Sequence, residues 1–152
     1  KKKIMSPLGY FTERQAEKLS DQISNEDLIV DFAMRYGNPS IKGKIHGLQK
    51  KGCENLIILP LYPQYAAATT ATVCDEVYRT LMKMRWQPSL QIISHYESEP
   101  MYIDALKNSL EKKLSELKWT PDLILASNHG IPKKYFEKRK CKIESRIFDQ
   151  SY

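Results

Sequence analysis

Several residue patterns are scarce in this 152-residue chain, and each scarcity excludes a class of protein. The three cysteines, Cys53, Cys74 and Cys141, are widely spaced and form no Cys-x-x-Cys pair, so they are expected to be reduced thiols rather than disulfides or zinc ligands. No glycine-rich loop follows any apolar run, which argues against a nucleotide-binding Rossmann module. No apolar run is long enough to span a bilayer, and Lys1-Lys2-Lys3 is not followed by the apolar stretch of a signal peptide.

The overall composition is that of a globular protein, and the reduced cysteines are typical of a cytoplasmic one. Hydrophobic residues make up 41% of the chain and charged residues 28%, which argues against disorder. The chain is long enough for one core, or for one domain and part of another. The net charge of +6 favours an anionic ligand or an acidic surface, but the lysines are spread along the chain and indicate no nucleic-acid site.

Apolar runs of strand length alternate with segments of helical periodicity. Strands are predicted at residues 28–34, 56–59, 90–93 and 122–126, with helices between them. The run Leu56-Ile-Ile-Leu59 is continuous, as in a strand buried on both faces of a sheet. This alternation predicts an α/β protein with parallel, Rossmann-like sheets and helices on both faces.

Capping residues predict where several helices begin and end. Thr12 and Gln15 have capping-box spacing and predict a helix that begins at Thr12. Asn38-Pro39 predicts the start of the next helix, and Gly52 its left-handed C-terminal cap. Helical periodicity continues over residues 73–84, and Ser98-Glu99-Pro100 predicts the start of a further helix.

Chemically distinctive side chains follow three of the predicted strands. Arg35 and Tyr36 follow the first, and the guanidinium of Arg35 offers a fixed fork of donors to a carboxylate. Tyr62, Gln64 and Tyr65 follow the second, before small alanines, and form either the floor of a site for a flat ligand or an ordinary turn.

A histidine follows the fourth predicted strand. His129 carries an imidazole that can accept a proton or bind a metal ion, or that only ties the strand end to a neighbouring loop. His46 and His95 are expected to be structural or solvated.

Two of these motifs resemble the signatures of ferrochelatases. They are Tyr62-Pro63-Gln64-Tyr65 with Thr69-Thr70, and Ser127-Asn128-His129-Gly130-Ile131-Pro132. Ser6-Pro7-Leu8 and Arg35-Tyr36-Gly37-Asn38-Pro39 also resemble the family, and the likeness covers roughly residues 5–137. Both signatures occur in the family's order and separation.

The resemblance implies a two-domain, Rossmann-like chelatase fold that inserts ferrous iron into protoporphyrin IX in haem biosynthesis. Residues 1–118 would form most of the first domain, and residues 119–152 would begin the second. His129 would be the catalytic, metal-binding residue. The porphyrin-binding residues would be Ser6, Arg35, Tyr36, Tyr62, Gln64, Tyr65 and Thr69. The substrates would be porphyrin and ferrous iron, with no further cofactor; an iron–sulfur cluster is left open, and peripheral membrane contact is allowed.

The sequence also departs from the family pattern. Ala68 stands where serine is common, and Lys138-Arg139-Lys140-Cys141 replaces an expected Gly-Asp-Pro-Tyr stretch. The opening strand and the carboxylate opposite the histidine are expected but absent from this chain. The alternatives are therefore another tetrapyrrole chelatase, acting on coproporphyrin or cobalt, or a truncated, non-catalytic porphyrin-binding fragment.

Overall fold

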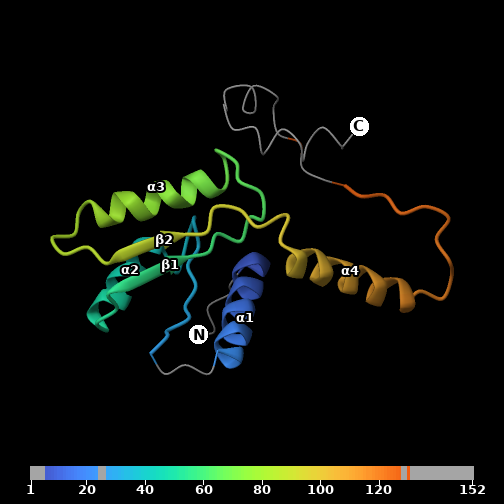
Figure 1. Cartoon of the computed structure of the whole chain (residues 1–152), viewed down its shortest axis with the longest axis horizontal. Coiled ribbons are helices and arrows are strands. Elements are labelled where there is room, and N and C mark those ends of the chain that lie inside the picture. Colours follow the sequence, from blue (N-terminus) through green and yellow to red (C-terminus); the bar gives the residue numbers. More distant parts are fainter. Residues whose placement is uncertain (1–5, 24–26, 128–129, 131–152) are drawn as a thin grey trace. The chain divides into compact units, whose positions relative to one another are not determined.

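The computed structural model describes residues 6–23, 27–127 and 130. The described residues fall into two compact units that divide between Glu97 and Ser98. The first unit contains α1 (Pro7–Gln22), α2 (Ile41–Lys50), β1 (Asn55–Ile58), α3 (Thr70–Leu81) and β2 (Ser89–Ile92), and the second contains α4 (Pro100–Ser115) (Figure 1).

A parallel sheet of two strands lies at the centre of the first unit. Leu56 in β1 is paired with Leu90 in β2, and the two strands are joined by α3. A crossover helix between parallel strands is the elementary unit of α/β proteins, so the predicted fold class is confirmed. The strands predicted at residues 56–59 and 90–93 are also confirmed, each shifted by one residue.

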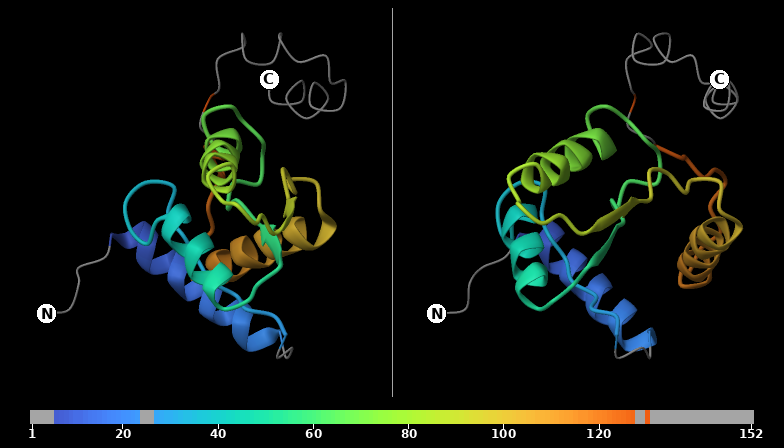
Figure 2. Two further views of the ribbon diagram at one scale, coloured as in Figure 1. Left: turned by 90° about the vertical axis from the view of Figure 1, so that its left-hand side faces the viewer. Right: turned by 60° about the vertical axis from the view of Figure 1, so that its left-hand side comes forward.

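The hydrophobic core lies between one face of this sheet and the helices α2 and α3. Figure 2 shows both helices on the same side of the strands. Val77 of α3 is fully buried at the centre of the core, and Leu56 contributes from β1. The core cluster consists of Ile41, Ile45, Leu56, Val73, Val77, Leu81 and Met84.

The expectation that residues 56–59 are buried on both faces of the sheet is wrong for this unit. Side chains alternate between the two faces of a strand, and only the face that carries Leu56 and Ile58 packs against the core. Ile57 points to the other face, where 62% of it is exposed.

Two of the predicted strands belong to no sheet of the described residues. In segment 28–34 the backbone N–H of Phe32 donates to Asp31 Oδ1 at 2.8 Å, and that of Met34 donates to the Pro39 carbonyl at 2.7 Å. These donors are used locally, so only an isolated bridge between Met34 and Ser40 forms. Segment 122–126 is irregular and exposed. Its apolar composition favours a strand but does not supply a neighbour to pair with.

Helix starts differ from the predicted caps at two places. Helix α1 begins at Pro7, because the Ser6 hydroxyl accepts a hydrogen bond from the Gly9 N–H at 3.2 Å, so the predicted start at Thr12 is wrong. Thr12 instead donates its hydroxyl proton to the Leu8 carbonyl. Helix α2 is capped by Ser40, two residues after the predicted Asn38.

The other helix boundaries agree with the sequence prediction. Gly52 ends α2 in the left-handed region with φ 85°, and the N–H of Cys53 donates to the Leu48 carbonyl at 3.1 Å. Helix α4 begins at Pro100, as predicted.

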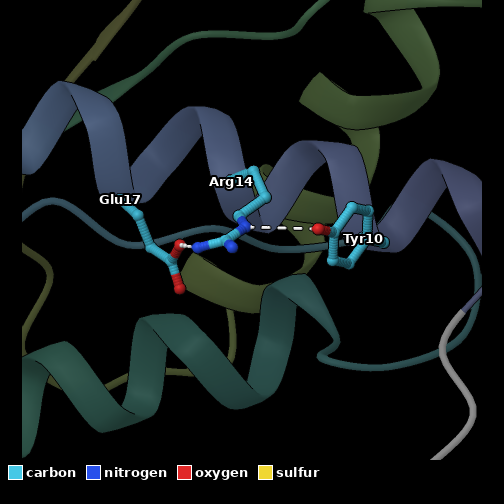
Figure 3. A network of polar contacts seen from close by, with 3 residues as sticks. All are labelled: Tyr10, Arg14 and Glu17. Atoms are coloured by element: carbon cyan, nitrogen blue, oxygen red, sulfur yellow. Dashed lines mark hydrogen bonds and ion pairs between the residues drawn. The ribbon is translucent and has the colours of Figure 1, made fainter.

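Polar contacts link three side chains on the surface of α1. Arg14 donates to the Tyr10 hydroxyl and to Glu17, and these hydrogen bonds raise the pKa of Arg14 above its ordinary value (Figure 3).

Candidate functional site

The connection from β1 to α3, residues 59–69, carries four of the predicted site residues. Tyr62 and Gln64 are exposed, Tyr65 is half-buried, and Ala66 is buried beneath them. The Ala66 carbonyl accepts the N–H groups of Thr69 and Ala71 at 3.1 and 3.2 Å, which folds the connection into the first turn of α3. Ala67 and Ala68, which follow Ala66, are exposed.

Thr69 is the N-cap of α3, but its hydroxyl donates back to the Ala66 carbonyl at 3.3 Å rather than capping the helix. The next residue, Thr70, is fully buried, and its hydroxyl has no hydrogen-bond partner among the described residues. Thr69 therefore stabilises the turn in this structure. A role in binding stays a prediction.

The segment that follows β2 runs beside this connection. The N–H of Ile93 donates to the Ile58 carbonyl at 3.0 Å, and the N–H of Tyr96 donates to the Pro63 carbonyl at 2.9 Å. The two segments thus extend together beyond the carboxyl ends of the parallel strands (Figure 1). This is the edge at which open α/β sheets bind ligands.

Arg35 and Tyr36 are in direct contact. The guanidinium carbon of Arg35 lies 4.5 Å from the centre of the Tyr36 ring, which is largely exposed. The Nε atom of Arg35 is buried and has no hydrogen-bond partner among the described residues. The cation–π contact positions the guanidinium beside the ring, whereas Nε itself is enclosed by protein.

An ion pair stabilises the loop that carries Arg35. Lys44 of α2 pairs with Asp31, and its ammonium group also lies 5.4 Å from the centre of the Phe32 ring. Both side chains of the pair are partly shielded from solvent. Asp31 and Lys44 close the loop of residues 32–43, so the Arg35–Tyr36 pair is presented from an anchored segment.

The remaining predicted site residues are Ser6 and His129. Ser6 caps α1. The sequence did not predict this role, because the capping-box spacing at Thr12 predicted a helix start six residues later. His129 lies outside the described residues, and its assignment as catalytic and metal-binding residue stays a prediction. The structure thus joins Arg35 to Tyr36 and holds Tyr62, Gln64, Tyr65 and Thr69 on one connection.

Neither cysteine of the described region is arranged as a metal ligand. Cys53 and Cys74 are free thiols, and burial raises the pKa of Cys74. Cys74 is therefore largely a protonated thiol near neutral pH, whereas metal ions bind the thiolate. In residues 6–23, 27–127 and 130, no group of three or more histidine, cysteine, aspartate or glutamate side chains could hold a metal ion. In the same residues, no helix is long and apolar enough to cross a membrane.

Sequence reasoning missed one pair of polar side chains at this edge of the sheet. His95 and Glu97 follow β2, and their Nδ1 and Oε2 atoms lie 3.4 Å apart. His95 was expected to be structural or solvated, and no motif surrounds it. A histidine two residues from a carboxylate just beyond a strand is the only signal the sequence offers.

These observations define an α/β protein in which Tyr62, Gln64, Tyr65 and Thr69 lie on the connection beyond the carboxyl end of β1. The ferrochelatase family model matches residues 2–149, so the chain belongs to the ferrochelatase family.

The curated relatives that match it carry the name Ferrochelatase. The chain is 54% identical to that of Allorhizobium ampelinum over 111 residues, and 54% identical to that of Rhizobium meliloti over 109 residues. It is 51% identical to that of a Bradyrhizobium species over 110 residues. These matches cover 71–72% of this chain but only 31–32% of each relative, so the chain spans about a third of their length.

Proposed function

We propose that this protein is a ferrochelatase that inserts ferrous iron into protoporphyrin IX, as the last step of haem biosynthesis. The observation that carries the proposal is the family match over residues 2–149, which includes both the Tyr62–Thr70 and the Ser127–Pro132 motifs. The fold supports it, because the first of these motifs lies on the connection beyond β1, where an α/β sheet binds ligands.

The chemistry divides into holding the ring and moving its protons. A free-base porphyrin is planar and carries two inward N–H protons, which must leave as the metal ion enters. Tyr62, Gln64 and Tyr65 form a wall against which the ring is held, and the Arg35 guanidinium pairs with a propionate carboxylate. His129 accepts a pyrrole proton or receives the metal ion first. Ferrous iron is a substrate here, and no further cofactor is proposed.

The domain arrangement and the location follow from the same assignment. Residues 1–118 form most of a first Rossmann-like domain, and residues 119–152 begin a second that contains the histidine motif. The free thiols of Cys53 and Cys74 agree with a cytoplasmic location. The net charge of +6 agrees with contact at an acidic membrane surface, such as the one a porphyrin partitions into.

A second candidate function is porphyrin binding without metal insertion. The observation that favours it concerns the described residues, which include Arg35, Tyr62 and Tyr65 but no group of three or more histidine, cysteine, aspartate or glutamate side chains that could hold a metal ion. The tyrosines and the arginine would give affinity for the ring without metal insertion.

The deciding experiment measures porphyrin binding and metal insertion on the same sample. Binding is followed by quenching of the protein's tryptophan fluorescence, and insertion by the emission of zinc protoporphyrin and the absorbance of haem formed anaerobically. Saturable binding together with turnover supports the chelatase. Saturable binding without turnover supports the binding module, and the absence of both removes the two proposals. Repeating the assay with coproporphyrin and with Co²⁺ distinguishes the related tetrapyrrole chelatases.

A further inference from the structure

His95 and Glu97 form an unusual pair just beyond β2. The Nδ1 atom of His95 lies 3.4 Å from Oε2 of Glu97, and the Glu97 side chain is only 10% exposed. His95 is half exposed, so the pair opens to solvent on the side of the imidazole. Oε2 of Glu97 is buried and accepts no hydrogen bond from any other described residue.

A buried carboxylate oxygen without a hydrogen bond is destabilising, because the group has lost its water and gained nothing in return. The imidazole does not supply that hydrogen bond, since 3.4 Å is longer than the ordinary N–H···O range of about 2.7–3.2 Å. A cation bound between the two atoms would satisfy the carboxylate and use the lone pair of the imidazole.

The separation of the two atoms fits ligands of one metal ion. Zinc binds imidazole nitrogen and carboxylate oxygen at about 2.0–2.2 Å with tetrahedral angles, which places two ligand atoms about 3.4 Å apart. Imidazole and carboxylate are also accepted by ferrous iron. We propose that His95 Nδ1 and Glu97 Oε2 bind a divalent metal ion, with water in the remaining coordination positions.

The position of the pair indicates what this site is for. Tyr96, the residue between the two ligands, donates its N–H to the Pro63 carbonyl at 2.9 Å. The pair is therefore tied to the connection that carries Tyr62, Gln64 and Tyr65. The site holds the metal substrate beside the porphyrin before insertion, and this assignment of purpose rests on the proposed function. Two protein ligands bind weakly enough to release the ion again.

Zinc titration followed by histidine NMR tests the site directly. The sequence has three histidines, His46, His95 and His129, so their imidazole signals are assigned by single substitutions. We expect Zn²⁺ to shift the His95 signal, and Glu97→Gln to raise the Zn²⁺ concentration needed by about tenfold or more, the effect of losing a metal-site partner. The His46 signal serves as the control. The proposal would be wrong if Zn²⁺ did not shift the His95 signal, or if the parent protein and Glu97→Gln needed the same Zn²⁺ concentration. His95 and Glu97 would then form only an ordinary ion pair.

Two further arms keep the proposal testable. Should Glu97→Gln fail to fold, His95→Asn replaces it, because His95 is exposed. Zn²⁺ binding is then followed by the Tyr96 amide signal. A Zn²⁺ titration midpoint equal to that of the parent protein would overturn the site. In the insertion assay, His95→Asn should raise the KM for Zn²⁺ about tenfold while kcat and porphyrin affinity are retained. No insertion by the parent protein contradicts the proposed function alone. Insertion with an unchanged KM in His95→Asn contradicts the loading role alone.

Discussion

The guanidinium carbon of Arg35 lies 4.5 Å from the centre of the Tyr36 ring, and the Nε atom of Arg35 is buried without a hydrogen-bond partner among the described residues. Stacking on an aromatic ring restricts the guanidinium to one plane without using its N–H groups. A carboxylate can accept two parallel hydrogen bonds from the terminal N–H groups of a guanidinium. The pair is thus suited to recognise a propionate of a porphyrin.

Replacing Arg35 should weaken porphyrin binding specifically. Arg35→Ala is expected to cost about 1.5–3 kcal/mol of binding free energy, the range for hydrogen bonds to charged groups, as measured by fluorescence quenching. The porphyrin affinity of Arg35→Lys should lie between those of the parent protein and Arg35→Ala, because lysine keeps the charge but lacks the planar guanidinium. The matched control is Arg79→Ala, which removes an exposed arginine paired with Glu76 on α3. Equal porphyrin affinity in Arg35→Ala and Arg79→Ala would remove Arg35 from the site.

A substitution of Ser6 separates capping from ligand binding. Ser6→Ala removes the acceptor for the Gly9 N–H and should destabilise α1 by about 1 kcal/mol, seen as faster amide exchange in its first turn. Ser6→Asp should restore protection, because aspartate is an equally good N-cap. If Ser6 also touches a propionate, Ser6→Asp will bind porphyrin more weakly than Ser6→Ala through charge repulsion. Equal porphyrin affinity in the two variants would leave Ser6 with the capping role alone.

What the sequence predicted well is local and periodic. The strands near residues 56 and 90, the helix between them and the glycine cap at Gly52 all follow from patterns within a few residues. What it predicted poorly is the choice between neighbouring residues that could each cap the same helix. Ser6 and Ser40 were passed over as caps because Thr12 and Asn38 carry stronger sequence signals, although the backbone N–H groups select the serines.

The same limit applies to the candidate site. The sequence supplied Arg35, Tyr36 and the residues of the β1–α3 connection from motif likeness, but not the stacking of Arg35 on Tyr36. It also gave no reason to single out Glu97, which is buried beside His95 in a segment where Tyr96 donates a backbone hydrogen bond to Pro63, more than thirty residues earlier. Contacts of this kind are set by tertiary packing, which periodicity does not encode.

The two faces of the sheet should differ in their sensitivity to truncation. Val77 is fully buried, so Val77→Ala is expected to lower the free energy of unfolding by about 2–3 kcal/mol, from lost burial and the cavity left behind. Ile57→Ala removes a side chain that is 62% exposed and should cost less than about 1 kcal/mol. Urea denaturation measures both. A loss at Ile57 as large as that at Val77 would show that the outer face of β1 is covered in solution.

Cys74 should make the folded state sensitive to high pH. Burial raises the pKa of this thiol, so the folded state holds the proton more tightly than the unfolded chain. The associated stability is present below the unfolded pKa of about 8.5 and is lost as the pH rises through the folded pKa. Urea midpoints measured from pH 7 to pH 10 should therefore fall more steeply for the parent protein than for Cys74→Ala. Parallel curves would contradict a raised pKa at this position.

The sharpest test of mechanism concerns His129, which the resemblance assigns to the metal-insertion centre. Insertion requires a group that takes a pyrrole proton or receives the metal ion, and an imidazole can do either near neutral pH. His129→Ala should therefore lower the rate of zinc insertion by roughly 10²-fold or more, the lower range of general acid–base catalysis. Porphyrin affinity should be retained, because it comes from Tyr62, Tyr65 and Arg35.

The matched control for this prediction is His46→Ala, on α2, which should leave the rate of zinc insertion and the porphyrin affinity unchanged. If His129 only ties its own segment to a neighbouring loop, the alanine variant will unfold at a lower temperature yet insert zinc at a normal rate per folded molecule. Normal turnover in the folded variant would remove His129 from the chemistry, even though the chain belongs to the ferrochelatase family.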